Sequence, residues 1–329
     1  MRSRGHEVLL LISEKKVDAT ASEKYCDLRF ETVPAIAKPS TFSPKMLGFL
    51  WRLRKTIRHC RKILDREKAD VVLGMGGFTS FPPVYAGSKM GLRTYIHDSN
   101  AIPGRSNRLT ARRCTAVLVG MKEAAGYFPG LPVVHTGTPV RQELTKLPSR
   151  DEACASFRLD PAKRTLLVMG GSQGARSLNT VVVEGTIGTG WQVLHLTGQD
   201  DFERVTQEVG DRVGYRVMAF CSEMGSALAA ADFCLARSGA SSLTELSHAG
   251  LPALMVPYPY AADDHQTANA RVYERAGAAF LQTQDEVTAE KLTGILGKLT
   301  GESLEGRATA MKGLAEPEAA VKIAKVVEG

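Results

Sequence analysis

Short apolar runs alternate with longer amphipathic stretches along most of this chain. Each run ends in a glycine-rich or polar turn, which is typical of buried strands. The strands expected in the first half are Val8–Ile12, Val71–Leu73, Thr94–Ile96, Ala116–Val119 and Val133–Thr136. Those expected in the second half are Thr165–Met169, Gln192–Leu196, Tyr215–Met218, Phe233–Ala236, Ala253–Val256 and Ala279–Leu281. Helical stretches between them predict two α/β domains with parallel sheets.

The domain boundary and the first residues also follow from local pattern. Leu147-Pro148-Ser149-Arg150 has a loop composition, so we expect domains at 1–146 and 147–329, with the last helix packing back on the first domain. Met1–Val8 reads as a helix end, a glycine cap and then a strand. A βαβ domain normally starts with a strand and its glycine loop, so the chain is expected to lack its first βα unit.

Two glycine-rich loops after apolar strands give the main chemical signal. They are Gly74-Met75-Gly76-Gly77 and the run from Gly170 to Ala175. A helix that opens after such a loop presents backbone N–H groups at its positive end, which suits phosphate. The pair predicts a phosphate site in each domain, both facing a shared cleft.

A third segment, Arg237-Ser238-Gly239-Ala240, leads from a strand into a helix rich in small hydroxyl residues. Its first turn can bind a diphosphate, and Glu245, one turn further, can accept hydrogen bonds from both ribose hydroxyls. The alternative is a capping box, Ser242-x-x-Glu245, which needs no ligand. Gln266 opens a later helix and can bond sugar hydroxyls, although polar helix starts are common without ligands.

Polar residues after strands of the first half offer further chemistry. His97 and Asp98 form a candidate general base, alone or as a pair. Adjacent residues leave a strand on opposite faces, so the two side chains need not both point into the cleft. The alternative is that they bond local backbone. Arg141 is a candidate phosphate or hinge contact, or else a surface arginine.

Charge is divided unevenly. The net charge is +14 over residues 1–150 and −7 over 151–329, which predicts an anionic surface or substrate for the first half. Lys45 to Lys62 contains seven basic residues, no acidic one and several bulky apolar ones, as in a helix lying on anionic lipid. The alternative is an amphipathic helix within Pro44–Lys68 whose Leu50, Leu53, Ile57 and Ile63 face the core.

Composition excludes several classes of protein. With 43% apolar and 23% charged residues the chain is expected to be globular, without a signal peptide or a transmembrane run. Its six cysteines are scattered without a CxxC pair, which argues against zinc or a disulfide framework and for a reduced cytosolic enzyme. No nucleic-acid-binding motif is present.

Together these motifs resemble the MurG family of peptidoglycan N-acetylglucosaminyltransferases, within the GT-B glycosyltransferases, over nearly the whole chain. The motifs are Gly5-His6-Glu7-Val8, Val72-Leu73-Gly74-Met75-Gly76-Gly77, His97-Asp98-Ser99-Asn100, Thr138-Pro139-Val140-Arg141, Gly170-Gly171-Ser172-Gln173-Gly174-Ala175 and Arg237-Ser238-Gly239-Ala240. The resemblance implies two Rossmann-like domains around a cleft. It further implies inverting transfer from UDP-N-acetylglucosamine to the muramoyl 4-hydroxyl of lipid I, forming lipid II at the cytoplasmic face of the inner membrane, without metal or cofactor.

The resemblance also implies site residues. In the donor domain they are Ser172 for the diphosphate, Ala240, Ser241, Ser242, Leu243 and Thr244 at a helix start, Glu245 for the ribose, Cys221 for uracil through its main chain, and Gln266 for sugar hydroxyls. Asn100 and Arg141 line the cleft, Gly76 and Gly77 form the acceptor-side loop, and the stretch around Phe49 to Lys62 meets the membrane.

Two departures from the family pattern matter. His97-Asp98 replaces a common His-Glu pair, and the opening strand with its Gly-Gly-Thr-Gly-Gly-His loop, which holds a favoured general-base histidine, is absent. We favour a start codon further upstream, because the rest of the pattern is intact. The alternatives are another GT-B glycolipid transferase, for instance one acting on diacylglycerol, or a non-catalytic nucleotide-sugar-binding protein.

Overall fold

The computed structural model describes residues 1–14, 27–34, 44, 46–170 and 176–329. They divide into two compact units. Unit 1 comprises Met1–Ser99, Pro103–Thr136 and Val321–Gly329, and unit 2 comprises Asn100–Ile102 and Gly137–Ala320.

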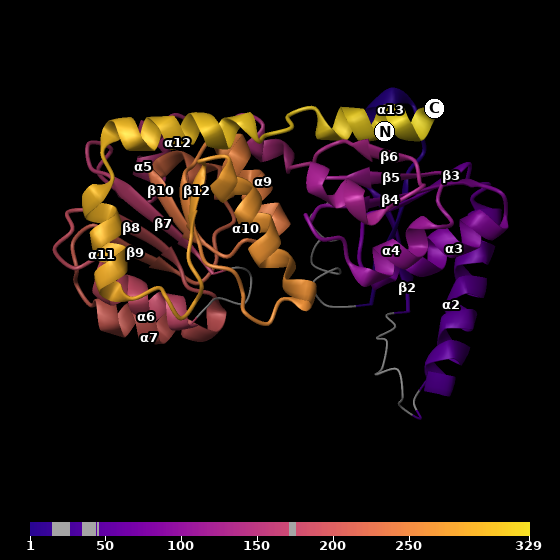
Figure 1. The fold of residues 1–329 in the computed structure, drawn as a ribbon, viewed down its shortest axis with the longest axis horizontal. Coiled ribbons are helices and arrows are strands. Elements are labelled where there is room, and N and C mark those ends of the chain that lie inside the picture. The colour runs from indigo at the N-terminus through magenta and orange to yellow at the C-terminus, as the bar shows by residue number, and fades with distance from the viewer. Residues whose placement is uncertain (15–26, 35–43, 45, 171–175) are drawn as a thin grey trace. The chain divides into compact units, whose positions relative to one another are not determined.

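Unit 1 contains two parallel sheets (Figure 1). One pairs β1 (Leu9–Ser13) with β2 (Arg29–Val33), and the other has the order β3-β4-β5-β6, formed by Val71–Gly74, Arg93–Asp98, Ala116–Val119 and Val133–His135. Strand β2 was not predicted from the sequence. Its two apolar residues, Phe30 and Val33, fall on opposite faces of the strand, so no alternation marks it.

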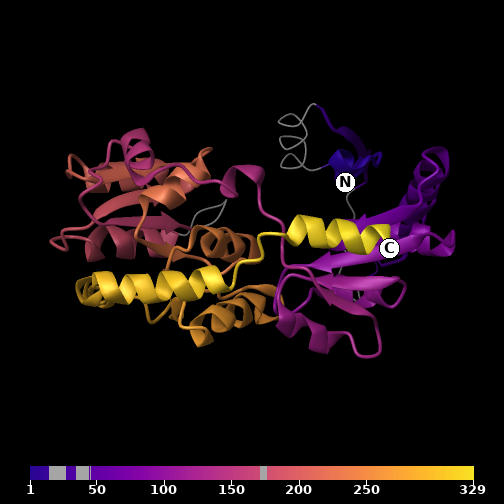
Figure 2. The ribbon, with the colours of Figure 1, turned by 90° about the horizontal axis from the view of Figure 1, so that it is seen from above.

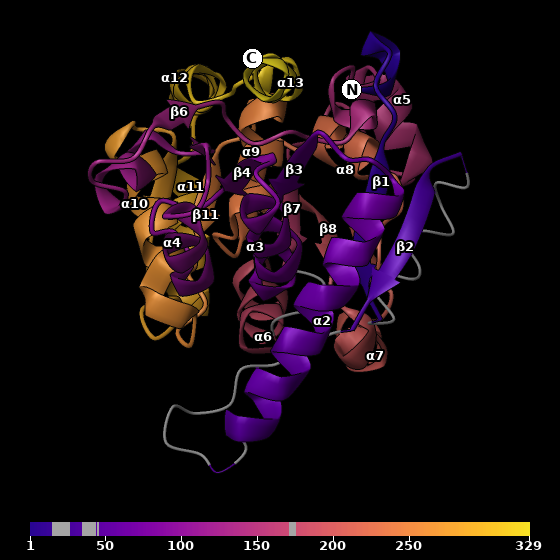
Figure 3. The same ribbon diagram turned by 90° about the vertical axis from the view of Figure 1, so that its right-hand side faces the viewer.

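Helices of unit 1 cover its sheets from distant parts of the chain. They are α2 (Met46–Arg66), α3 (Phe81–Lys89), α4 (Arg105–Ala111) and most of α13 (Ala319–Glu328), with 3-10 turns at Arg2–Arg4, Phe78–Ser80 and Lys122–Tyr127. Helix α2 lies beside β2 and α3 (Figure 3). It buries Cys60 and Ile63. The C-terminal helix α13 lies over strands of unit 1 (Figure 2). Its Ile323 and Val327 pack against Tyr95 and Leu118.

Unit 2 is built around one parallel sheet with the strand order β12-β11-β10-β7-β8-β9. In chain order from β7 the strands are Thr165–Met169, Gln192–Leu196, Tyr215–Met218, Phe233–Ala236, Ala253–Met255 and Ala279–Leu281. The order in which strands are added to the sheet reverses at β7: β8 and β9 lie on one side of it, and β10, β11 and β12 lie on the other. In open α/β sheets ligands bind beyond the carboxyl ends of the strands at such a point.

Helices cover both faces of this sheet (Figure 1). Helices α6 (Arg176–Gly185), α7 (Phe202–Val209) and α11 (Ala289–Lys298) pack together. A second group comprises α5 (Arg150–Ser156), α8 (Met224–Ala230), α9 (Ala240–Ala249) and α12 (Gly301–Gly313), while α10 (His265–Arg275) packs on β12. Short 3-10 turns span Gln142–Leu144, Gln199–Asp201 and Ala262–Asp264. The expectation of two α/β units with parallel sheets is confirmed.

Candidate functional site

The start of α9 presents backbone N–H groups ahead of its helical hydrogen bonds, at the switch point of the unit 2 sheet. Gly239 is the N-cap residue, and the first bond of the helix runs from Leu243 N to Gly239 O. The N–H groups of Ala240, Ser241 and Ser242 therefore precede the intrahelical ladder and can donate to an anion. The side chain of Leu243 is fully buried, and the Thr244 hydroxyl donates to Ala240 O.

The capping-box alternative is wrong, because Ser242 lies inside the helix and Glu245 has another partner. Arg141 Nη2 donates to Glu245 Oε1 at 3.0 Å, and Arg141 Nη1 lies 3.0 Å from Glu143 Oε1. Burial raises the pKa of Glu245, and the Arg141 guanidinium partly opposes that rise. Arg141 and Glu245, which the sequence suggested separately, therefore form one ion pair, and Glu245 lies one turn into α9.

Asn269 organises the neighbouring loops, and sequence reasoning missed it. Its side chain is fully buried on α10, where Oδ1 accepts from Ala101 N at 2.8 Å. Its Nδ2 donates to Ser238 O and Asn100 Oδ1, both at 3.1 Å. The available signal was an amide between two alanines, one helical turn after Gln266. Asn100, an expected site residue, is thereby tied to the segment that opens α9.

Gln266 lies at the second position of α10 and holds the preceding loop. Its Oε1 accepts from Tyr258 N at 2.9 Å, and its carbonyl accepts from the Ser238 hydroxyl at 2.8 Å. Among the described residues its Nε2 has no hydrogen-bond partner. That amide is therefore placed to donate to a ligand oxygen, as the sequence suggested for a sugar hydroxyl.

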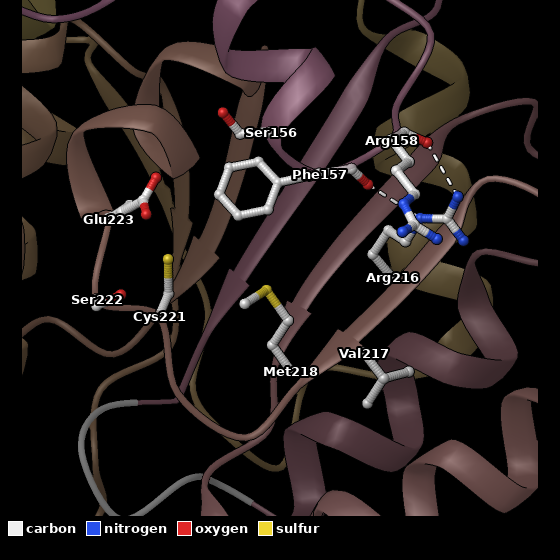
Figure 4. Close-up of a pocket in the computed structure, with 9 residues that line it drawn as sticks. All are labelled: Ser156, Phe157, Arg158, Arg216, Val217, Met218, Cys221, Ser222 and Glu223. Atoms are coloured by element: carbon white, nitrogen blue, oxygen red, sulfur yellow. Dashed lines mark hydrogen bonds between the residues drawn. The ribbon is translucent and has the colours of Figure 1, made fainter.

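Cys221 lines a cavity of about 370 Å³ beside the end of β9. Figure 4 shows the side chains of Cys221, Met218 and Phe157 around one space, with Glu223 on its flank. Arg216 closes the other side by donating to Phe157 O at 2.9 Å and Arg158 O at 3.0 Å. Burial raises the pKa of the Cys221 thiol, so this residue offers a neutral side chain and its backbone. Ser172, the expected diphosphate contact, lies outside the described residues.

In unit 1 the expected catalytic pair is buried. His97 is fully enclosed, and Asp98 Oδ2 accepts from Gly104 N at 2.9 Å and Asn107 Nδ2 at 2.6 Å. Asp98 therefore anchors the start of α4, which favours the structural alternative over a general base. Gly76, with φ of +98°, approaches this anchor, because a Cβ on it would lie 3.4 Å from Asn107 Nδ2 and from His97 O.

Gly77 also has a positive φ, +74°, but a Cβ on it would meet nothing within 4 Å. This part of the β3 loop faces open space, unlike Gly76. A ligand can therefore approach Gly77, and the expected role of this residue in the acceptor-side loop stays a prediction.

The amphipathic helix α2 has apolar side chains outside the core. Leu47, Leu50 and Trp51 are exposed, Leu50 to 51%, and Lys55 Nζ lies 5.6 Å from the Trp51 ring centroid. The alternative, an amphipathic helix with Leu50 and Ile63 facing the core, is wrong for Leu50, whereas Ile63 is buried. Lys45 lies outside the described residues. No helix in the described part of the chain is both long and apolar enough to cross a membrane.

Within the described ranges, no group of three or more His, Cys, Asp or Glu is arranged to hold a metal ion. Five of the cysteines lie in the same ranges, at positions 60, 114, 154, 221 and 234, and all five are free thiols.

Comparisons with known proteins identify the family. Residues 1–119 match the glycosyltransferase family 28 N-terminal domain, and residues 165–326 match the family's C-terminal domain. The computed structure aligns with the crystal structure of Acinetobacter baumannii MurG, with a TM-score of 0.79 at 24% identity, over 99% of this chain and 92% of that one. It also aligns with a Staphylococcus aureus MnaA–UDP structure, with a TM-score of 0.67 at 12% identity, over 97% and 95%. These likenesses show the GT-B fold.

Curated relatives carry one name, UDP-N-acetylglucosamine–N-acetylmuramyl-(pentapeptide) pyrophosphoryl-undecaprenol N-acetylglucosamine transferase. The Halothermothrix orenii protein is 31% identical over 99% of this chain and 92% of its own length. The Solibacter usitatus protein is 34% identical over 100% and 89%. The Synechococcus elongatus protein is 39% identical over 73% of this chain, and the match spans 66% of that relative. The chain therefore belongs to glycosyltransferase family 28, in the branch formed by these MurG-type transferases.

Proposed function

We propose that this chain transfers N-acetylglucosamine from UDP-N-acetylglucosamine to the muramoyl 4-hydroxyl of lipid I, with inversion at the anomeric carbon. The product is lipid II, made for peptidoglycan at the cytoplasmic face of the bacterial inner membrane. The names of the relatives support the reaction, and the observation that carries it here is the Arg141–Glu245 pair beside the open start of α9.

On the donor side, the ribose, the diphosphate and the sugar of UDP-N-acetylglucosamine each have a matching group. Glu245 accepts hydrogen bonds from the two ribose hydroxyls, and Arg141 keeps its carboxylate ionised and oriented. The N–H groups at the start of α9 stabilise the diphosphate as it departs with an additional negative charge. Gln266 donates its amide to a sugar hydroxyl.

On the acceptor side, the open β3 loop at Gly77 contacts lipid I, and Asp98 holds α4 in place next to that loop. Because Asp98 and His97 are buried, we assign them positioning roles and place the general base elsewhere.

Helix α2 supplies the membrane contact. Its exposed Leu47, Leu50 and Trp51 insert among lipid headgroups, while the arginines and lysines of the same helix attract anionic lipid.

A transfer assay with radiolabelled UDP-N-acetylglucosamine and a lipid I analogue tests the reaction. Lipid II should form with the unmodified chain, fall strongly with Glu245→Ala and persist with Glu143→Gln, whose carboxylate also bonds Arg141 but lies outside α9. Product formed on diacylglycerol but not on lipid I would identify a different glycolipid transferase. UDP binding without any transfer would refute the proposed activity.

Flotation with vesicles of phosphatidylglycerol and phosphatidylcholine tests the membrane contact. Trp51→Ser should reduce binding to the anionic vesicles, while Ile187→Ser, an equally exposed apolar position in unit 2, should leave it unchanged. Binding should also weaken as salt rises. Equal binding to purely neutral vesicles would contradict the charge argument.

A further inference from the structure

A pair of exposed aromatic rings follows β11 at the carboxyl edge of the unit 2 sheet. Tyr258 and Tyr260 are 45% and 81% exposed, and their ring centroids lie 5.6 Å apart with an interplanar angle of 73°. This edge-to-face arrangement is favourable between aromatic rings. Tyrosine is enriched at binding interfaces, because its ring is apolar while its hydroxyl can stay in water.

The loop that carries the rings is held rigidly. Pro257 and Pro259 fix φ beside each tyrosine, and Ala261 N donates to Tyr258 O at 3.1 Å. Downstream, Asp263 and Asp264 adopt φ of +53° and +52°, a region that residues other than glycine rarely occupy. Such backbone conformations persist only where the surrounding structure enforces them, and they cluster at ligand sites.

The same loop is bonded to the expected sugar-binding residue. Gln266 Oε1 accepts from Tyr258 N at 2.9 Å, and the Arg237 guanidinium lies 5.7 Å from the Tyr258 ring centroid. The aromatic pair and the free amide of Gln266 are therefore parts of one local structure.

The strand order decides which end of the nucleotide sugar reaches the pair. Cys221, which the family resemblance implies for uracil, follows β9 at one edge of the sheet, and Glu245 follows β10. Strand β11 lies on the far side of β10 from β9. A ligand laid along the carboxyl edge, with its base near β9, directs its sugar towards β11 and the tyrosines.

We propose that Tyr258 and Tyr260 form a stacking platform for the pyranose ring of the donor sugar. This inference rests on the proposed function. The face of an aromatic ring is electron-rich, so it attracts the weakly positive C–H groups on one face of a pyranose. Tyr260 contacts the sugar, and Tyr258, fixed by Gln266, holds the Tyr260 ring in place.

Calorimetry with UDP-N-acetylglucosamine and with UDP tests this role in the full chain. Tyr260→Ala should weaken binding of the nucleotide sugar by about 2- to 10-fold, the range of one aromatic contact, and leave UDP binding unchanged. Tyr260→Phe, which keeps the ring, should bind both like the unmodified chain. Val213→Ala, at a highly exposed apolar position near β9, is the control.

Where the unmodified chain binds both ligands, three results would overturn this inference but leave the proposed function intact. The first is unchanged nucleotide-sugar affinity in Tyr260→Ala, and the second is an equal loss of UDP affinity in that variant. The third is a loss of nucleotide-sugar affinity in Tyr260→Phe as large as in Tyr260→Ala. A change confined to the KM of the lipid acceptor would also overturn it. Failure of the unmodified chain to bind UDP-N-acetylglucosamine would instead refute the proposed function, and this inference with it.

Discussion

Replacing Glu245 by alanine tests the donor site at its most specific contact. The carboxylate is largely buried, and in the proposed complex it accepts hydrogen bonds from both ribose hydroxyls. Hydrogen bonds to a charged group contribute about 1.5–3 kcal/mol, and part of this is recovered when water fills the space left by the shortened side chain. We therefore expect the variant to bind UDP about 1–3 kcal/mol more weakly, or about 5- to 150-fold.

Calorimetry with UDP and with 2′,3′-dideoxy-UDP separates this contact from general damage to the site. The unmodified chain should bind the dideoxy ligand more weakly than UDP, while Glu245→Ala should bind both alike. Glu143→Gln should discriminate between the ligands as the unmodified chain does, because Glu143 shares Arg141 but not the ribose. If Glu245→Ala still discriminates fully, or binds UDP with unchanged affinity, Glu245 does not hold the ribose.

Three further changes test the site and its support. Burial raises the pKa of Glu245 and the Arg141 guanidinium opposes this rise, so Arg141→Ala should raise that pKa further. As the pH is lowered, the UDP affinity of this variant should therefore begin to fall at a higher pH than that of the unmodified chain. Asp98→Ala leaves the buried Asn107 amide and the Gly104 N–H without their acceptor and should lower the free energy of unfolding by about 1–3 kcal/mol in denaturant titrations. Ile323→Ala should lower the free energy of unfolding by about 2–4 kcal/mol in the same measurement. Val321→Ala, at an exposed position of the same helix, should lower it by less than about 0.5 kcal/mol. Equal effects would contradict the packing of α13 in unit 1.

Two predictions from local sequence patterns were wrong, one at the start of α9 and one on α2. The capping-box pattern at Ser242 and Glu245 is satisfied in the sequence, but Gly239 starts the helix earlier and leaves Glu245 for Arg141. The helical period of α2 was correct, yet Leu50 is exposed, because only one side of this helix packs against the sheet and α3. Periodicity predicts that a face is apolar but not which neighbour covers it.

The sequence by itself determined the alternation of strands and helices, the glycine turns and the family, since each depends on residues close together in the chain. Only the tertiary structure decided which of these residues act together. Arg141 meets Glu245 across 104 positions, and Asn269 joins Asn100 to Ser238 through a buried amide. The physical reason is that a hydrogen bond depends on position and direction within a few tenths of an ångström. Packing of the parallel sheet and its helices sets those positions, and a pattern of residue types does not.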